Sequence, residues 1–209
     1  YLIPMAGAIW SMPQKDIMNY PVKSLFEFFN NHKLMHGKKD RPKWLTVSGG
    51  SINYVNKIIN FLEANPKVKL FKNNGVKKIN RENEIIKITD TEGNTSEVDH
   101  IVFSQNPSKV VNILNDIQKK ELDILGKFKA NKNTAYLHSD ESLMPKTKKI
   151  WSSWNIFVPR DEKNHISVTY WMNKLQNIYY KTPLFLSLNP VRLPNEGSIF
   201  KVIDYEHPI

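Results

Sequence analysis

The sequence predicts a mixed α/β (α+β) protein in which one domain interrupts another. Three observations support this class. Helix-like and strand-like runs alternate between residues 44 and 107, as in an α/β domain. After residue 133, five strand-like runs follow one another without long helices, which favours a largely antiparallel sheet. Apolar residues make up 40 % of the 209 residues, which is enough to bury a core in one large domain or two small ones.

The first 63 residues predict helices separated by one short strand. Residues 1–42 are expected to be helical or irregular, with an apolar helical stripe in "VKSLFEFFNNHKLM" and a helix start just after Pro21. A short strand is expected at 43–47, and Ser48, Gly49 and Gly50 form a turn after it. Apolar residues then recur at spacings of three and four from residue 51, which predicts a helix that ends before Pro66.

Strand signals dominate the next part of the chain. We expect a strand in "KVKLFKN" and then strand, turn, strand, turn, strand over 75–104, with "TEGN" as the hairpin turn. The third of these strands, "VDHIVFS", ends in an apolar run that suits a strand covered on both faces, as in a parallel sheet. Residues 108–130 are expected to be helical. The five later strands are expected in "NTAYLHS", "IWSSWNIFV", "HISVTYWMN", "PLFLSLNP" and "IFKVIDYE".

Charge and composition exclude several classes of function. The net charge is +10, but 26 of the 30 basic residues are lysines, whereas sites that read bases favour arginine. We therefore expect no nucleic-acid partner. The absence of cysteine excludes disulfides, thiolate zinc sites and a catalytic cysteine. No apolar run is long enough to span a membrane and the amino terminus is a poor signal peptide, so we expect a cytoplasmic location.

Catalytic and metal motifs are weak, so the catalytic residues stay unknown. His32 and His36 are four residues apart, but no acidic partner follows them as in a zinc-binding HExxH motif, and we expect no metal site. "SGGS" is not the GxSxG of a nucleophilic serine. The pair Gly49-Gly50 leaves two alternatives open. Glycines before a helix either allow an anion to approach the helix N-terminus, or are needed only because the turn has no room for a side chain.

Aromatic residues suggest a binding cavity in the second half of the chain. Trp151, Trp154, Tyr170 and Trp171 lie on neighbouring predicted strands. Trp151 and Trp154 form one pair along the chain, and Tyr170 and Trp171 form the other. Within each pair the two side chains are expected to face opposite sides of the sheet. One of each pair could therefore line a cavity for an apolar or planar small molecule while the other packs in the core. The alternative is that all four belong to the core.

The order of elements from 44 to 107 resembles the central segment of the flavin-containing amine oxidase superfamily. The matching features are a double-glycine turn, a helix, a strand, a strand with "VKKI", a hairpin with Gly93, and a strand "DHIVF" followed by "QNP". The flanking strings "LIPMAGAIWSMP", "LHSDESLMP", "WSSWN", "VTYWMNKLQ" and "YEHP" resemble a bacterial subgroup of predicted NAD/FAD-binding proteins.

This resemblance implies FAD as cofactor and a Rossmann-like FAD/NAD(P)-binding domain interrupted by a substrate domain. It assigns 43–108 to the cofactor domain, and 1–42 and 109–209 to the substrate domain. It implies cofactor contacts at Val76, Ser104, Gln105 and Asn106, with Gly49 and Gly50 as a landmark of the same domain. The aromatic set, Trp151, Trp154, Tyr170 and Trp171, would belong to the substrate domain.

One departure from the family bears on function. The GxGxxG fingerprint that holds the pyrophosphate is absent. Both ends of the chain look cut, so we expect an internal fragment whose partners include the missing amino- and carboxy-terminal parts of the same protein. The expected function is the central portion of an FAD-dependent oxidoreductase, amine oxidase-like, that removes a hydride from a C–N or C–C bond of an apolar or amphipathic small molecule. The alternative is a non-catalytic fragment or binding module that keeps the fold without the cofactor.

Overall fold

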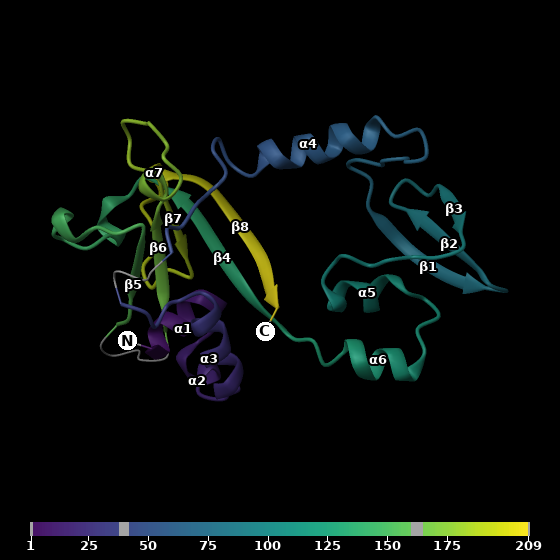
Figure 1. The fold of residues 1–209 in the computed structure, drawn as a ribbon, viewed down its shortest axis with the longest axis horizontal. Coiled ribbons are helices and arrows are strands. Elements are labelled where there is room, and N and C mark those ends of the chain that lie inside the picture. The colour runs from purple at the N-terminus through teal and green to yellow at the C-terminus, as the bar shows by residue number, and fades with distance from the viewer. Residues whose placement is uncertain (1, 38–41, 160–164, 209) are drawn as a thin grey trace. The chain divides into compact units, whose positions relative to one another are not determined.

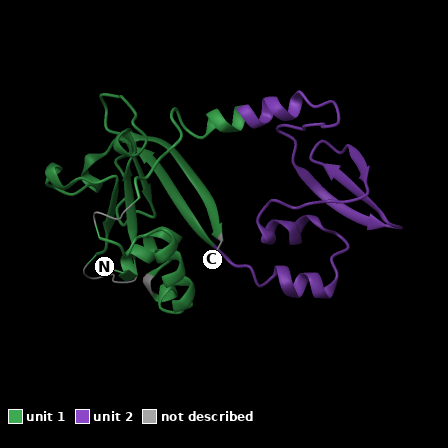
Figure 2. Cartoon of the chain, viewed as in Figure 1, with its two compact units in different colours: residues 1–56, 131–207 green, residues 57–130, 208–209 purple. Residues whose placement is uncertain are grey.

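The chain divides into two compact units, and one of them interrupts the other in sequence (Figure 2). The computed structural model describes residues 2–37, 42–159 and 165–208. Unit 1 contains residues 1–56 and 131–207, and unit 2 contains the intervening residues 57–130. The fold is mixed α/β, with helices and two antiparallel sheets, as the sequence predicts (Figure 1). The assignment of 1–42, 43–108 and 109–209 to substrate and cofactor domains stays a prediction.

Three helices form the amino-terminal part of unit 1: α1 (Leu2–Trp10), α2 (Gln14–Ile17) and α3 (Val22–Asn31). Their shared core contains Ala6, Met12, Ile17 and Phe29, all buried. The ring of Trp10 lies 4.8 Å from the ring of Phe28, on the stripe that the helical periodicity predicted. The expected helix after Pro21 is therefore confirmed.

The second part of unit 1 is a five-stranded sheet in the order β5-β6-β7-β4-β8. Its strands are β4 (Ala130–His138), β5 (Trp154–Phe157), β6 (Ser167–Trp171), β7 (Phe185–Leu188) and β8 (Ile199–Pro208). Short helical turns connect them: η1 (Glu141–Leu143), η2 (Lys148–Ile150), α7 (Met172–Leu175) and η3 (Glu196–Ser198). The pairs β5–β6, β6–β7 and β7–β4 are antiparallel. All five predicted strands are confirmed.

The register of this sheet places a polar row on one face. Asn155 pairs with Thr169, and Thr169 pairs with Ser187. His138 lies at the end of β4, opposite Phe185. Because successive side chains alternate between faces, Trp154 and Tyr170, which pair with each other, lie on the other face.

Unit 2 has a three-stranded antiparallel sheet, β1 (Val76–Glu82), β2 (Ile85–Asp90) and β3 (Thr95–Val98), followed by α5 (Pro107–Ile113) and α6 (Lys119–Leu125). The predicted hairpin turn is confirmed, with Gly93 at φ +91° between β2 and β3. The core joins the sheet to α5, because buried Ile79 forms a backbone bridge with Leu114.

Three sequence predictions in this region are wrong in detail. Residues 43–47 and 67–73 form no strand, and the third strand of the small sheet ends at Val98 rather than continuing to residue 104. Among the described residues, no strand pairs with these β-prone segments, and a lone strand leaves its backbone groups without partners. Most of the apolar residues in them are exposed, with Leu45 85 % and Val102 92 % exposed, and Ile101 and Phe103 are partly buried.

Helix α4 (Ile52–Glu63) confirms the predicted helix but buries none of its residues. Its apolar stripe includes Val55, Ile59 and Leu62, which are only partly buried. The helix begins in unit 1 and ends in unit 2 (Figure 2).

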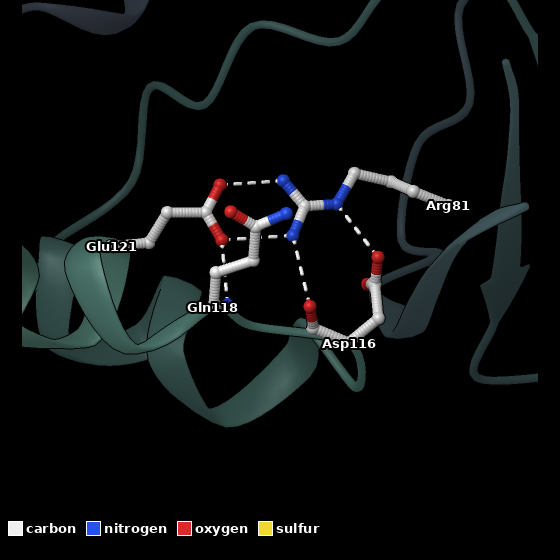
Figure 3. Close-up of polar contacts among 4 residues, drawn as sticks. All are labelled: Arg81, Asp116, Gln118 and Glu121. Carbon is white, nitrogen blue, oxygen red and sulfur yellow. Dashed lines mark hydrogen bonds and ion pairs between the residues drawn. The ribbon is translucent and has the colours of Figure 1, made fainter.

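An arginine fork ties α6 to the small sheet of unit 2 (Figure 3). Arg81 on β1 donates to both carboxylate oxygens of Glu121, at 2.6 and 2.8 Å, and from Nε to Asp116 at 2.8 Å. Glu121 also accepts from the backbone N–H of Gln118, three residues earlier, at the start of α6. These hydrogen bonds, chiefly those from Arg81, lower the pKa of Glu121 from 4.5 to about 2. Bidentate charge-assisted contacts of this kind are the stronger class of ion pair.

We predict that unit 2 loses stability in acid through Glu121. A carboxylate with a lower pKa in the folded state stabilises that state above its unfolded pKa, and this contribution disappears as pH falls from 4.5 to about 2. Glu121→Gln keeps an acceptor for the Gln118 N–H but removes the charge. Because the pair is about one third exposed, we expect a loss of about 1 kcal/mol at pH 7.

Unit 2 contains no tryptophan, so tryptophan fluorescence does not report its stability. Hydrogen exchange measured by mass spectrometry on 76–82 and 119–125 tests the prediction instead. The amides of these two segments should exchange about fivefold faster in Glu121→Gln at pH 7. The difference from the unsubstituted chain should shrink as pH falls below 4.5 and be small near pH 2. Glu97→Gln, at an exposed carboxylate on β3, is the control and should change little. Equal effects of the two substitutions would contradict the role of the Arg81 fork.

Candidate functional site

Unit 1 contains a cavity of about 510 Å³ beside the polar row of its sheet. Three segments contribute to its wall: the stretch after β4, the paired strands β5 and β6, and the loop after β7. The lining residues are Ser142, Leu143, Met144, Pro145, Lys146, Asn155, Ile156, Phe157, Ser167, Thr169, Pro190, Val191 and Arg192. The volume lies in the range typical of small-molecule sites, and the wall combines apolar side chains with a few polar groups.

A buried hydrogen-bonded chain runs from β4 to this cavity. His138 Nε2 lies 2.8 Å from Ser187 Oγ, and Ser187 Oγ lies 2.7 Å from Thr169 Oγ1. The side chains come from three neighbouring strands, β4, β7 and β6, and all three are buried. Thr169 is the member of the chain that lines the cavity.

The backbone sets the direction of this chain. The N–H of Asp140 donates to His138 Nδ1 at 3.1 Å, so Nδ1 carries no proton. Burial lowers the pKa of His138, against a smaller opposing effect of Asp140, which keeps the ring neutral with its one proton on Nε2. Nε2–H therefore donates to Ser187 Oγ. Ser187 is fully buried, and among the described residues its hydroxyl proton has only Thr169 Oγ1 as an acceptor, so we infer that Ser187 donates to Thr169.

Asp140 anchors the segment that covers the sheet after β4. Its carboxylate accepts from the backbone N–H of Ser142 at 2.8 Å and of Asn195 at 3.0 Å. Burial alone would raise the pKa of Asp140, but the hydrogen bonds from Ser142 and Asn195 outweigh it, and the pKa is lowered. Arg192 donates to the carbonyl of Ser142 at 2.8 Å, so the loop after β7 is attached to the same segment.

The four aromatic residues proposed from sequence form two pairs, and none of them lines this cavity. Trp151 packs edge-to-face on Trp171, with ring centroids 5.3 Å apart, in a core that includes Phe185. Trp154 packs on Tyr170 at 5.2 Å, and burial raises the pKa of Tyr170 to about 12. As expected, Tyr170 and Trp171 lie on opposite faces of the sheet, and Trp151 and Trp154 pack against different partners. A role of these residues in substrate binding stays a prediction.

The residues matched to FAD contacts outside the glycine pair lie in unit 2. Val76 begins β1 and is 41 % exposed, next to an irregularity in the pairing with β2. Ser104 and Gln105 are exposed and precede α5. Asn106 is the N-cap of α5, and its side-chain oxygen accepts from the N–H of Ser108 at 3.2 Å. The structure thus gives Asn106 a local role, and cofactor binding by these residues stays a prediction.

The glycine pair has a steric explanation. Gly49 and Gly50 have φ +75° and +90°, a region that favours glycine. A Cβ on Gly49 would also lie 2.5 Å from Asn53 Nδ2, which donates to the carbonyl of Ser48 at 2.6 Å. The geometry therefore supports a turn that requires glycine, rather than an anion site, as the reason for this pair. Binding of FAD near this pair stays a prediction.

The residues described here do not by themselves form an FAD site. Val76, Ser104 and Gln105 lie on open surface, and the side chain of Asn106 is engaged in its cap. No GxGxxG segment is present in the sequence to hold a pyrophosphate. Within the described ranges, no group of three or more histidine, aspartate or glutamate side chains could hold a metal ion. No helix in the same ranges is long and apolar enough to cross a membrane.

Sequence reasoning missed His138, Ser187 and Thr169. His138 and Ser187 are 49 residues apart, and only the strand pairing brings them together. The one local signal was the alternation in "SVTYW", where Ser167 and Thr169 share a face. In an antiparallel sheet such a polar face normally indicates solvent.

Comparisons with known proteins show the fold. No protein-family model matches the chain, and no curated protein matches it in sequence. A solved structure from Exiguobacterium sp. 255-15, named "Putative protoporphyrinogen oxidase", is similar over 83 % of this chain and 41 % of its own, with 13 % identity and a TM-score of 0.53. A CLA-producing fatty acid isomerase from P. acnes is similar over 73 % of this chain and 39 % of its own, with 12 % identity and a TM-score of 0.45. The chain thus spans about two fifths of the length of each.

We predict that Gly49→Ala destabilises the turn before α4. An alanine at φ +75° costs about 1 kcal/mol, and its Cβ displaces the Asn53 side chain from Ser48. Urea unfolding followed by tryptophan fluorescence measures the loss, because all five tryptophans lie in unit 1. Gly197→Ala is the matched control, since a Cβ there meets nothing within 4 Å. Equal stability of the two variants would contradict the steric role of Gly49.

Proposed function

We propose that this chain is the central portion of an FAD-dependent oxidoreductase, amine oxidase-like, that removes a hydride from a C–N or C–C bond of an apolar or amphipathic small molecule. The observation that carries the proposal is the fold likeness over 83 % of the chain to a protein named as an oxidase. The order of sequence motifs between residues 44 and 107 supports the same class, and of the elements expected there the helix and the hairpin with Gly93 are formed, whereas 67–73 and 99–104 form no strand. In such an enzyme bound FAD would supply the hydride acceptor, and the protein would supply binding and orientation.

Open strand-like segments support a cofactor domain that is completed by further polypeptide. Residues 43–47, 67–73 and 101–104 carry apolar side chains without a strand partner among the described residues. Helix α4 has an apolar stripe in which no residue is fully buried. Strands and amphipathic helices of this kind are stable when a neighbouring layer covers them. We propose that the missing amino- and carboxy-terminal parts of the protein supply that layer and most of the FAD site.

A second candidate is a binding module that keeps the fold without the cofactor. The observation that favours it is the cavity in unit 1, because none of the residues matched to FAD contacts lines it. Such a module would bind a small molecule and leave it unchanged. The two candidates differ in one property, which is whether flavin binds.

We predict that a longer protein that carries the residues flanking this chain binds FAD. The measurement is the visible absorbance of the purified protein, followed by release of the flavin on unfolding. A folded long protein without bound FAD, even after incubation with excess FAD, would count against the oxidoreductase.

The chain 1–209 is the matched comparison. It should not bind FAD at micromolar concentration in a fluorescence titration, because it lacks a phosphate-binding fingerprint. Micromolar binding by residues 1–209 would instead contradict the binding-module candidate.

A further inference from the structure

We propose that the cavity of unit 1 binds a small apolar acid through its carboxylate. Nothing in this proposal depends on flavin, because every lining residue belongs to unit 1 and to the part of the chain after residue 141. Three properties of the wall support it: the sign of its charge, the direction of a buried hydroxyl, and the apolar character of the remaining surface.

The charged residues of the wall are both cations. Lys146 and Arg192 line the cavity, and no aspartate or glutamate is among the lining residues. Neither cation has an ion-pair partner among the described residues, and Arg192 donates only to the carbonyl of Ser142. Two unneutralised positive charges near a low-dielectric wall favour a negatively charged ligand and disfavour a positively charged one.

The hydroxyl of Thr169 adds a directed donor. Because His138 donates to Ser187 and Ser187 donates to Thr169, the Thr169 oxygen is already used as an acceptor, and its own proton needs another acceptor. Thr169 is 5 % exposed and lines the cavity. A ligand oxygen would accept this proton, whereas an ammonium group has no acceptor and would leave it without a partner.

The rest of the wall is mainly apolar. Leu143, Met144 and Pro145 come from the segment after β4, Phe157 from β5, and Pro190 and Val191 from the loop after β7. Such side chains bury hydrocarbon and gain free energy in proportion to the area removed from water. A carboxylate attached to an aliphatic or aromatic body therefore satisfies both kinds of surface.

Titration calorimetry on the chain 1–209 tests the charge preference. The probes are octanoate, octan-1-ol and octylamine, which share one hydrocarbon body and differ in the head group. Octanoate should bind at least tenfold more tightly than either of the others. No measurable binding of octanoate, or equal or tighter binding of octylamine or octan-1-ol, would overturn the proposal.

Substitutions locate the binding. Lys146→Gln and Arg192→Gln, at two exposed positions, should each weaken octanoate binding about three- to tenfold and leave octan-1-ol unchanged. Thr169→Val removes the hydroxyl at nearly constant shape and should weaken octanoate about fivefold. Lys149→Gln is the control, because Lys149 lies on η2 outside the lining and should leave the affinity unchanged.

Folding of each variant is checked by tryptophan fluorescence, which reports unit 1. If Thr169→Val does not fold, Lys146→Gln and Arg192→Gln decide the question, since neither side chain is buried. An octanoate affinity that is unchanged in both, or lowered equally by Lys149→Gln, would overturn the assignment of this cavity. These outcomes do not bear on the proposal that a longer protein binds FAD. That proposal is tested separately by the visible absorbance of the longer protein.

Discussion

The hydrogen bond from the backbone N–H of Asp140 to His138 orders the functional part of unit 1. It fixes the tautomer of a buried imidazole, so that His138 Nε2–H donates to Ser187, and the buried Ser187 hydroxyl has Thr169 as its acceptor. A buried chain of this kind is stabilising only when every member is satisfied, since one unpaired polar group costs about 1–3 kcal/mol. Loss of the Asp140 N–H would therefore disturb three strands at once. The side chain of Asp140 holds the covering segment in place through Ser142 and Asn195, so the same residue shapes the cavity wall.

Unit 2 depends on a different kind of interaction. Its buried apolar residues are few, and Ile79, Val110 and Leu114 form the contact between sheet and helix. Where apolar burial is limited, a bidentate ion pair between β1 and α6 adds a second attachment at modest cost, because Arg81 and Glu121 keep about a third of their side chains in water. The exposed strand-like segments fit this picture, since they add no area to the core. The two units also differ in their surfaces: a cavity lies beside the sheet of unit 1, whereas Val76, Ser104 and Gln105 of unit 2 are exposed.

Local sequence patterns predicted the elements that carry their own signal. The helix after Pro21, the helix α4, the hairpin at Gly93 and the five later strands all follow from periodicity and turn chemistry. The errors fall where a strand needs a partner: "WLTV", "KVKLF" and "HIVF" have β propensity, but pairing is a non-local property that one segment cannot reveal. The residues that line the cavity could not be predicted for the same reason. Trp151 and Trp171 attracted attention by size, yet the wall is built by smaller neighbours such as Thr169, whose importance depends on Ser187 and His138 from two other strands.

The charge of the cavity bears on which bond an oxidoreductase of this kind would break. An alkyl amine with a pKa near that of lysine, about 10.4, is a cation at neutral pH. Bringing it beside Lys146 and Arg192 would cost on the order of 1–4 kcal/mol for each charge at close range, and the lining residues include no carboxylate to offset that cost. A carboxylate would instead be attracted by both positive charges. If this cavity is where the proposed enzyme holds its substrate, C–C oxidation of an acid is favoured over C–N oxidation of an amine. The head-group comparison separates these two chemistries before any turnover is measured.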